Sequence, residues 1–249
     1  MSGRLFVASG IFHPETGGPA TYLHDILPHL QTLGWQVRVQ SYGDAPANDA
    51  YPYPVQRIPR RAYPLRMAHY ALTAWPNLRW ANLVYAHTID LPLIGGAAPR
   101  VIKIVGDQAW ERCMRKGWVA PDTDIDTFQQ ASYSRIVSQQ QASRSRQVRA
   151  MQGVIVPSDY LRRMVLGWGV PDERIHVVYN ALPTVPDDLP ASQAAARAAL
   201  GLHDRPTLFT AARLERWKGV DHLLHALRFV PDVCLIVAGD GPEMPQLGR

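Results

Sequence analysis

The feature that most constrains the fold is a repeated alternation of short buried strands with amphipathic helices. Residues 5–9 form an apolar run, residues 23–33 carry leucine and isoleucine at helical spacing, and residues 35–40 return to a strand pattern. The alternation continues with expected strands at 83–86, 101–105, 154–156 and 175–179, and with expected helices at 65–80, at 128–150 and from Ser158 onward. A helix between two strands returns the chain to start a parallel neighbour. The sequence therefore predicts an α/β fold with a doubly wound, mostly parallel sheet.

A proline-rich segment marks a domain boundary. Residues 182–190 carry three prolines and two acidic residues, which disfavour regular structure. We therefore expect one domain over residues 1–182 and a second over residues 183–249. The second shows a helix at 191–200, a strand at 207–212, a helix at 221–229 and a strand at 233–238. Two strands do not complete an open sheet, so we expect a partial Rossmann-like domain in a truncated chain.

The composition is typical of a globular protein of the cytoplasm. Hydrophobic residues make up 47% of the 249 residues, which is enough for a sizeable core. The two cysteines, Cys113 and Cys234, are too few for a disulfide framework, so we expect a cytoplasmic location. The longest uncharged stretch, residues 67–78, is well short of the roughly 20 apolar residues that span a bilayer.

The charge balance predicts an anionic partner. The formal net charge is +5, and the sequence pI is about 9.4. Arginines form two clusters, Arg57, Arg60, Arg61 and Arg66, and Arg135, Arg144, Arg146 and Arg149. We interpret both as solvated surfaces, the alternative being peripheral contact with the anionic inner face of a membrane. No module of interleaved aromatic and basic residues accompanies them, so we expect no nucleic-acid partner.

A short loop in the second domain carries phosphate-binding chemistry. Arg213 and Lys218 stand five residues apart between a strand at 207–212 and a helical pattern from Val220 on. Arginine offers a planar fork for phosphate oxygens, lysine offers a mobile point charge, and Gly219 allows close backbone approach. A solvated basic loop is the alternative for such a spacing taken by itself.

Three loops together carry a family resemblance. Phe12-His13-Pro14-Glu15-Thr16-Gly17-Gly18 follows the first strand, Arg213-Leu214-x3-Lys218-Gly219 follows a later one, and Gly239-Asp240-Gly241-Pro242 follows the last. With Val156-Pro157-Ser158 and Tyr179-Asn180-Ala181, these segments resemble, in this order, the GT-B glycosyltransferases, specifically the retaining enzymes of family 4, glycosyl transferase group 1. The resemblance runs from Leu5 to the end. It implies that the first two loops face each other across a cleft that holds a nucleotide-sugar.

The resemblance implies a set of donor-binding glycines. Gly17 and Gly18 would contact the donor from the first domain, and Gly239 and Gly241 from the second, with ordinary turn formation as the alternative for both pairs. Arg213 and Lys218 would act as catalytic cations toward the leaving nucleoside diphosphate. A Rossmann dehydrogenase would instead require G-x-G-x-x-G after the first strand, which the sequence from Gly10 to Gly18 does not match.

Asp107 is the candidate on the acceptor side. It follows the strand expected at 101–105, at the carboxyl edge where open α/β sheets bind ligands. A carboxylate there accepts or orients the proton of an acceptor hydroxyl, and the alternative is a helix N-cap with Glu111 in the first turn. Gly106 stands where family members carry a histidine, so that role does not transfer. His87 is interpreted as structural.

One departure concerns the Glu-x7-Glu pair that family 4 enzymes carry later in the second domain. No two glutamates of this chain have that spacing. There is also no D-x-D metal motif in a suitable loop, because Asp122, Asp124 and Asp126 read as a solvated connection. We expect chemistry without metal or cofactor.

The resemblance implies a retaining transferase that moves a sugar from a nucleoside diphosphate sugar to a hydroxyl acceptor, lipid-linked in many family members, in cell-surface glycan or glycolipid synthesis. The alternatives are a truncated, non-catalytic binding module derived from the family, and another GT-B enzyme such as a phosphorylase or epimerase.

Overall fold

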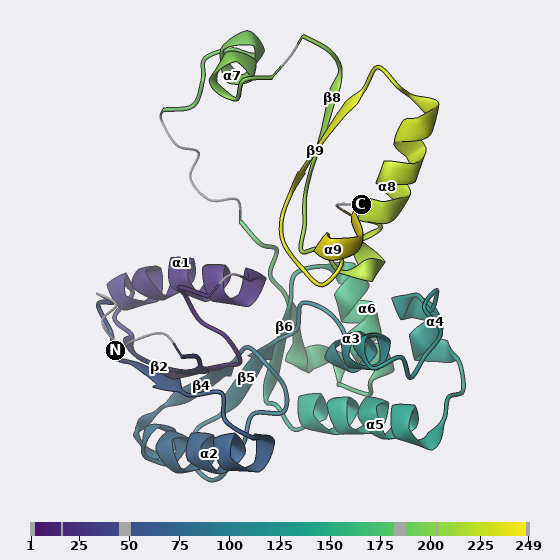
Figure 1. The fold of residues 1–249 in the computed structure, drawn as a ribbon. Coiled ribbons are helices and arrows are strands. Elements are labelled where there is room, and N and C mark those ends of the chain that lie inside the picture. The colour runs from purple at the N-terminus through teal and green to yellow at the C-terminus, as the bar shows by residue number, and fades with distance from the viewer. Residues whose placement is uncertain (1–2, 16, 45–50, 182–187, 203, 248–249) are drawn as a thin grey trace. The chain divides into compact units, whose positions relative to one another are not determined.

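The computed structural model describes residues 3–15, 17–44, 51–181, 188–202 and 204–247. It divides into two compact units, Met1–Ala181 and Leu182–Arg249 (Figure 1). The boundary expected at residues 182–183 lies outside the described residues. Each unit is described by itself.

The first unit is built on a seven-stranded, fully parallel sheet. The strands are β1 (Arg4–Ser9), β2 (Gln36–Tyr42), β3 (Val55–Ile58), β4 (Leu83–Ala86), β5 (Arg100–Lys103), β6 (Gly153–Val156) and β7 (Ile175–Val177). Their order is β3-β2-β1-β4-β5-β6-β7. The order runs outward in both directions from β1, which is the arrangement of a doubly wound sheet. The strand order therefore reverses between β1 and β4. The carboxyl ends of these two strands border the crevice in which such sheets bind ligands.

Helices cover both faces of this sheet (Figure 1). They are α1 (Gly18–Thr32), α2 (Tyr63–Trp80), α3 (Gln108–Arg115), α4 (Ile125–Gln130), α5 (Arg135–Arg149) and α6 (Asp159–Gly167), with a 3-10 turn η1 (Asp172–Arg174). Strand β1 is buried on both sides: Leu5 and Val7 pack in the cluster that includes α1, whereas Phe6 and Ala8 pack in the cluster that includes α2. This two-sided burial explains why the strand reads as a continuous apolar run.

The structure corrects two expectations about individual elements. The helix expected over residues 128–150 is broken into α4 and α5, because Ala131 leaves the helical conformation and Tyr133 folds back so that its ring centroid lies 5.4 Å from that of Phe128. Asp124 caps α4 by accepting a hydrogen bond from the amide of Thr127 at 2.7 Å. Strand β3 was not expected. It is a four-residue edge strand that begins just after Pro54, where a proline costs no ladder hydrogen bond.

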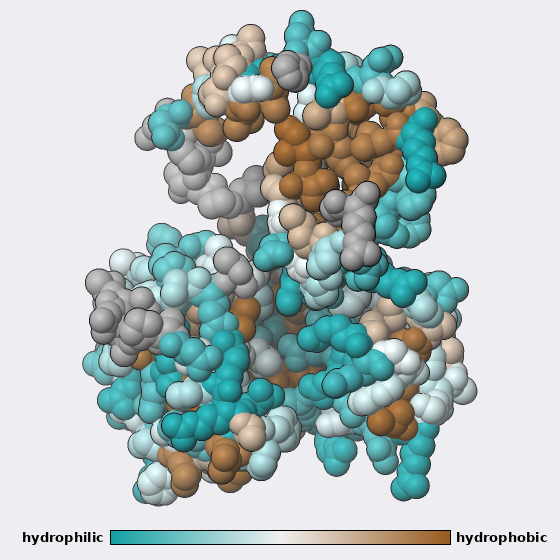
Figure 2. Space-filling model, in the orientation of Figure 1, coloured by the Kyte–Doolittle hydropathy of each residue, from teal (hydrophilic) through white to brown (hydrophobic). Residues whose placement is uncertain are grey.

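The second unit is smaller and has little buried surface. Its elements are α7 (Gln193–Ala199), β8 (Thr207–Ala211), η2 (Arg216–Lys218), α8 (Val220–Ala226), η3 (Leu227–Phe229), β9 (Cys234–Ala238) and α9 (Met244–Leu247). Strands β8 and β9 pair in parallel. Among the described residues of this unit, only Leu214, Glu215 and Val220 are buried, whereas Phe209 and Phe229 are exposed. Figure 2 shows apolar surface gathered on this unit.

No helix within the described part of the chain combines the length and the apolar character that a bilayer span requires.

Candidate functional site

The phosphate-binding loop connects β8 to α8 in the second unit. Arg213 follows β8, Lys218 ends the turn η2, and Gly219 takes a left-handed conformation with φ of 67°. The Arg213 side chain is 71% exposed, and its Nε lies 3.3 Å from Oε1 of the buried Glu215. Lys218 is exposed and has no carboxylate within 4.0 Å among the described residues. The loop therefore presents one oriented and one mobile cation to solvent.

Gly239 and Gly241 lie against this loop. A Cβ atom on Gly239 would come 1.9 Å from the carbonyl oxygen of Ala212, and one on Gly241 would come 2.4 Å from that of Leu214. The amide of Leu214 donates to the carbonyl of Asp240 at 2.9 Å. Only glycine permits so close an approach of two backbones. Close backbone packing thus explains why the turn contains glycine at positions 239 and 241. Contact of these glycines with a donor stays a prediction.

Gly17 and Gly18 stand between β1 and α1 in the first unit. Gly17 has a φ of 153° and precedes the helix as its N-cap, and its carbonyl accepts from the amide of Thr21 at 3.1 Å. At Gly18 a Cβ would meet no atom within 4 Å. The positive φ therefore explains why position 17 is a glycine. No neighbouring described atom explains why position 18 is a glycine. The role of Gly18 toward a donor stays a prediction.

Asp107 is fully buried at the start of α3. Its Oδ1 accepts from the amides of Ala109 at 2.9 Å and Trp110 at 3.2 Å, which makes it the N-cap. Its Oδ2 accepts from Gln129 at 2.8 Å and forms a close ion pair with the buried Arg144. The N-cap alternative is thus confirmed. A role toward an acceptor hydroxyl stays a prediction, and this carboxylate already serves four donors.

Two buried ionisable residues lie at the carboxyl ends of the central strands. Lys103 ends β5 and is 3% exposed, with its Nζ 2.7 Å from Oδ1 of Asn180 and 3.3 Å from the ring centroid of Tyr22. His87 follows β4, and neither ring nitrogen has a hydrogen-bond partner. Burial, reinforced by the charge of Lys103, lowers the pKa of His87 to about 4. His87 is therefore neutral, as a structural residue would be.

The sequence analysis missed Lys103. Its signal was a single lysine inside the apolar run Val101-Ile102-Lys103-Ile104-Val105. A lysine in a strand buried on both faces is rare unless a partner holds it. The partner is Asn180, within the Tyr179-Asn180-Ala181 segment that contributed to the family resemblance.

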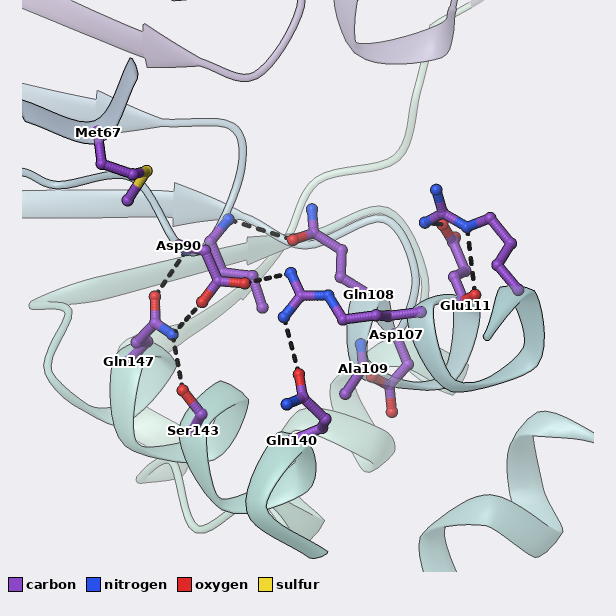
Figure 3. A network of polar contacts seen from close by, with 12 residues as sticks. Met67, Asp90, Asp107, Gln108, Ala109, Glu111, Gln140, Ser143 and Gln147 are labelled. Atoms are coloured by element: carbon purple, nitrogen blue, oxygen red, sulfur yellow. Dashed lines mark hydrogen bonds and ion pairs between the residues drawn. The ribbon is translucent and has the colours of Figure 1, made fainter. Parts of the chain in front are cut away.

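A further polar network surrounds Asp90, which was also missed (Figure 3). Asp90 follows β4 and has a φ of 62°, a conformation uncommon for residues other than glycine. Gln147 accepts from the Asp90 amide at 2.7 Å and donates to its carboxylate at 2.6 Å. Arg112 forms a close ion pair with the same carboxylate and donates to Gln140 at 2.8 Å. This network borders a cavity of about 790 Å³.

Asp90, like Asp107, follows the carboxyl end of a strand of the parallel sheet, where open α/β sheets bind ligands. Its own signal was the acidic residue four positions beyond a buried strand.

Within the described residues, no group of three or more His, Cys, Asp or Glu side chains could hold a metal ion.

The family model described as Glycosyltransferase Family 4 matches residues 16–185. A curated relative, "Alpha-maltose-1-phosphate synthase" of Mycolicibacterium smegmatis, is 36% identical over an aligned length of 260 residues. The alignment covers 99% of this chain. The chain spans 63% of the length of that relative.

Solved structures share the fold. Anabaena Alr3699/HepE in complex with UDP and glucose has a TM-score of 0.62 at 21% identity, over 98% of this chain and 62% of that one. The catalytic domain of starch synthase IV from Arabidopsis thaliana, bound to ADP and acarbose, has a TM-score of 0.64 at 12% identity, over 99% and 70% of the two chains. At these identities the likeness shows the fold alone. Because the family model covers more than half of the sequence, the chain belongs to Glycosyltransferase Family 4, and its fold class is α/β of the GT-B type.

Proposed function

We propose that this protein transfers a sugar from a nucleoside diphosphate sugar to a hydroxyl group of an acceptor, with retention of anomeric configuration. The observation that carries the proposal is the loop after β8, where Arg213 and Lys218 present two exposed cations. Glu215 orients the Arg213 guanidinium, and the close backbone contact with Gly239 and Gly241 holds the loop. A diphosphate is the ligand that such a pair of donors suits.

The relatives support a nucleotide-linked donor. Anabaena Alr3699/HepE was solved with UDP-glucose as well as with UDP and glucose, and starch synthase IV was solved with ADP. The curated relative is named for a phosphorylated disaccharide product. A hexose donor carrying UDP or ADP is therefore the first to test. Retention follows from the resemblance to family 4 enzymes.

The two cations have a clear chemical task in such a transfer. Negative charge builds up on the leaving diphosphate as the bond to the sugar breaks, so cations that bind it more tightly at that moment lower the barrier. Arg213, oriented by Glu215, supplies a fork for two phosphate oxygens. The flexible side chain of Lys218 brings its ammonium group to the phosphate oxygen on which negative charge develops.

Substitution of the two cations tests the proposal. We expect Arg213→Ala and Lys218→Ala each to lower turnover with UDP-glucose or ADP-glucose by about tenfold or more. The melting temperature should stay nearly constant, because both side chains are exposed. Arg228→Ala removes an exposed arginine outside the loop of the same unit and serves as the control. Unchanged turnover and unchanged affinity for UDP and ADP in both variants would refute the assigned roles.

A non-catalytic binding module is the second candidate. The observation that favours it is that the first unit contains nearly all of the buried hydrophobic side chains among the described residues. It predicts that acceptors bind while no label passes from a radiolabelled donor. Transfer of label in a single turnover contradicts it.

Several finer points stand as proposals of the same kind. They are a cytoplasmic location with peripheral contact at an anionic membrane face, catalysis without metal or organic cofactor, and a place in cell-surface glycan or glycolipid synthesis. The arginine-rich sequence and its net charge of +5 support attraction to an anionic surface.

A further inference from the structure

A second cavity of the first unit lies in the layer of helices that covers the sheet. Residues of α4, α5 and α6 line it, together with Ala131 after α4 and Trp168 after α6 (Figure 1). None of the described residues that line it belongs to a strand or to a loop that directly follows a strand. Its volume of about 510 Å³ falls in the range of small-molecule sites, which is about 300–1,000 Å³. We call it the helix-layer cavity.

A network of polar groups fixes the buried part of the lining. Gln129 accepts hydrogen bonds from Nε1 of Trp168 at 2.9 Å and from Arg144 at 3.3 Å. The same Gln129 donates to the carboxylate of Asp107 at 2.8 Å. Arg144 is 5% exposed, forms a close ion pair with Asp107, and lies with its guanidinium 4.1 Å from the ring centroid of Trp168. This part of the cavity is therefore preorganised, which lowers the entropic cost of binding a ligand.

Other lining residues keep polar atoms without partners. Oδ1 of Asp126 accepts from the hydroxyl of Tyr160 at 2.8 Å, whereas Oδ2 accepts from no described group. The amide nitrogen of Gln141 donates to the carbonyl of Phe128 at 2.7 Å, and its amide oxygen accepts from none of the described residues. Arg163 is exposed and forms no hydrogen bond or ion pair within the described part of the chain. Both acceptors and donors are thus available to a ligand.

The charges of the lining favour a neutral ligand. Asp107 balances the charge of Arg144, so Asp126 and Arg163 contribute one charge of each sign. An anionic ligand would be repelled by the first of these, and a cationic ligand by the second. A hydroxyl group both donates and accepts, and a carboxylate or guanidinium offers two adjacent atoms to a pair of neighbouring hydroxyl groups. The ring of Tyr160, which is 39% exposed, adds an apolar surface.

We propose that the helix-layer cavity binds neutral carbohydrate. Asp126, Gln141 and Arg163 hold the hydroxyl groups of the sugar, and the ring of Tyr160 packs against the C–H groups of its ring. The inference goes beyond the proposed transfer reaction and does not depend on it, because all lining residues lie in the first unit and none belongs to the loop of Arg213.

Free sugars and glycan polymers share this chemistry, so the experiment has two arms. Calorimetry measures the binding of glucose and of maltose in solution, and glycogen embedded in a native gel retards a protein that binds the polymer. We expect binding in at least one arm, with little change in affinity on added salt, because the ligand carries no charge. Retardation by glycogen without binding of glucose or maltose would assign the site to the polymer.

Two variants, each with a matched control, locate the bound carbohydrate. Arg163→Ala and Asp126→Asn should each weaken binding by about tenfold, because each removes hydrogen bonds to a charged group. Arg146→Ala and Asp122→Asn change an exposed arginine and an exposed aspartate outside the cavity, and both should bind as the parent does. Arg163 has no partner among the described residues, so a loss of binding in its variant reports the contact and not the fold.

The proposal is overturned if no carbohydrate binds in either arm. It is also overturned if both variants bind as the parent does, because the carbohydrate then lies elsewhere. Affinity for UDP and ADP, measured on the same samples, separates this inference from the proposed function, because Arg213 and Lys218 lie in the other unit. Nucleotide binding without carbohydrate binding removes this site and leaves the transferase standing, and the opposite result does the reverse.

Discussion

At the scale of single residues, the first unit buries a cation without a carboxylate. The Nζ of Lys103 contacts the amide oxygen of Asn180 and the ring face of Tyr22. A cation over an aromatic face is stabilised by about 2 kcal/mol or more when both are removed from water. Burial, and after it the neighbouring positive charge of Lys103, lowers the pKa of His87 and keeps its ring neutral near pH 7.

His87 makes the stability depend on pH. Its pKa is about 4 in the folded chain against 6.5 as a model value, so between these values the unfolded chain binds more protons. Stability therefore falls as pH drops from 6.5 toward 4, by up to about 3 kcal/mol at 1.36 kcal/mol per pKa unit. We expect His87→Leu to lose this contribution. Urea unfolding at pH 7 and pH 4.5 measures it, and an equal loss in parent and variant would show that His87 plays no part.

Residue roles were predictable where they depend on local sequence. The N-cap alternative for Asp107 followed from its place before a helical pattern with Glu111 in the first turn. Its ion pair with Arg144 did not, because the arginine comes from α5, 37 positions away. Lys103 and Asn180 meet across 77 positions for the same reason. Such pairs are set by tertiary packing, which sequence spacing does not encode.

At the scale of elements, the loop after β9 supports the loop after β8. Gly239→Ala would push a methyl group against the carbonyl of Ala212, so we expect it to destabilise the second unit and weaken nucleotide binding. Gly18→Ala is the matched comparison, since open space surrounds that position, and it should leave the melting temperature unchanged. Thermal unfolding of both variants checks this. Equal melting temperatures for Gly239→Ala and the parent would contradict the packing argument.

Elements with a strong apolar pattern were predicted well, and elements without one were not. The apolar runs of β1, β4 and β6 and the helical spacing of α1 fix their own conformation. Strand β3 is apolar only at its two ends, Val55 and Ile58, and depends on its pairing with β2. The interruption between α4 and α5 depends on Phe128 and Tyr133 packing together, a contact that periodicity does not reveal.

At the scale of the whole molecule, the two units differ in how much they bury. The first contains nearly all of the buried hydrophobic residues in the described part of the chain, whereas the second contributes Leu214 and Val220. Segments with few buried apolar contacts open most readily. We expect amides of β8 and β9 to exchange with deuterium faster than those of β1 and β4. Mass spectrometry of peptic fragments measures this, and equal protection of the two sheets would contradict it.

The lysines of this arginine-rich chain are only three, and each occupies a distinct environment. Lys103 is buried, whereas Lys116 borders the cavity beside Asp90 and Lys218 stands in the loop after β8. Mild methylation with ¹³C-formaldehyde, which reaches exposed amines, would thus label one side chain in each unit besides the amino terminus. The unsubstituted protein would then carry two separate NMR reporters, one in each unit.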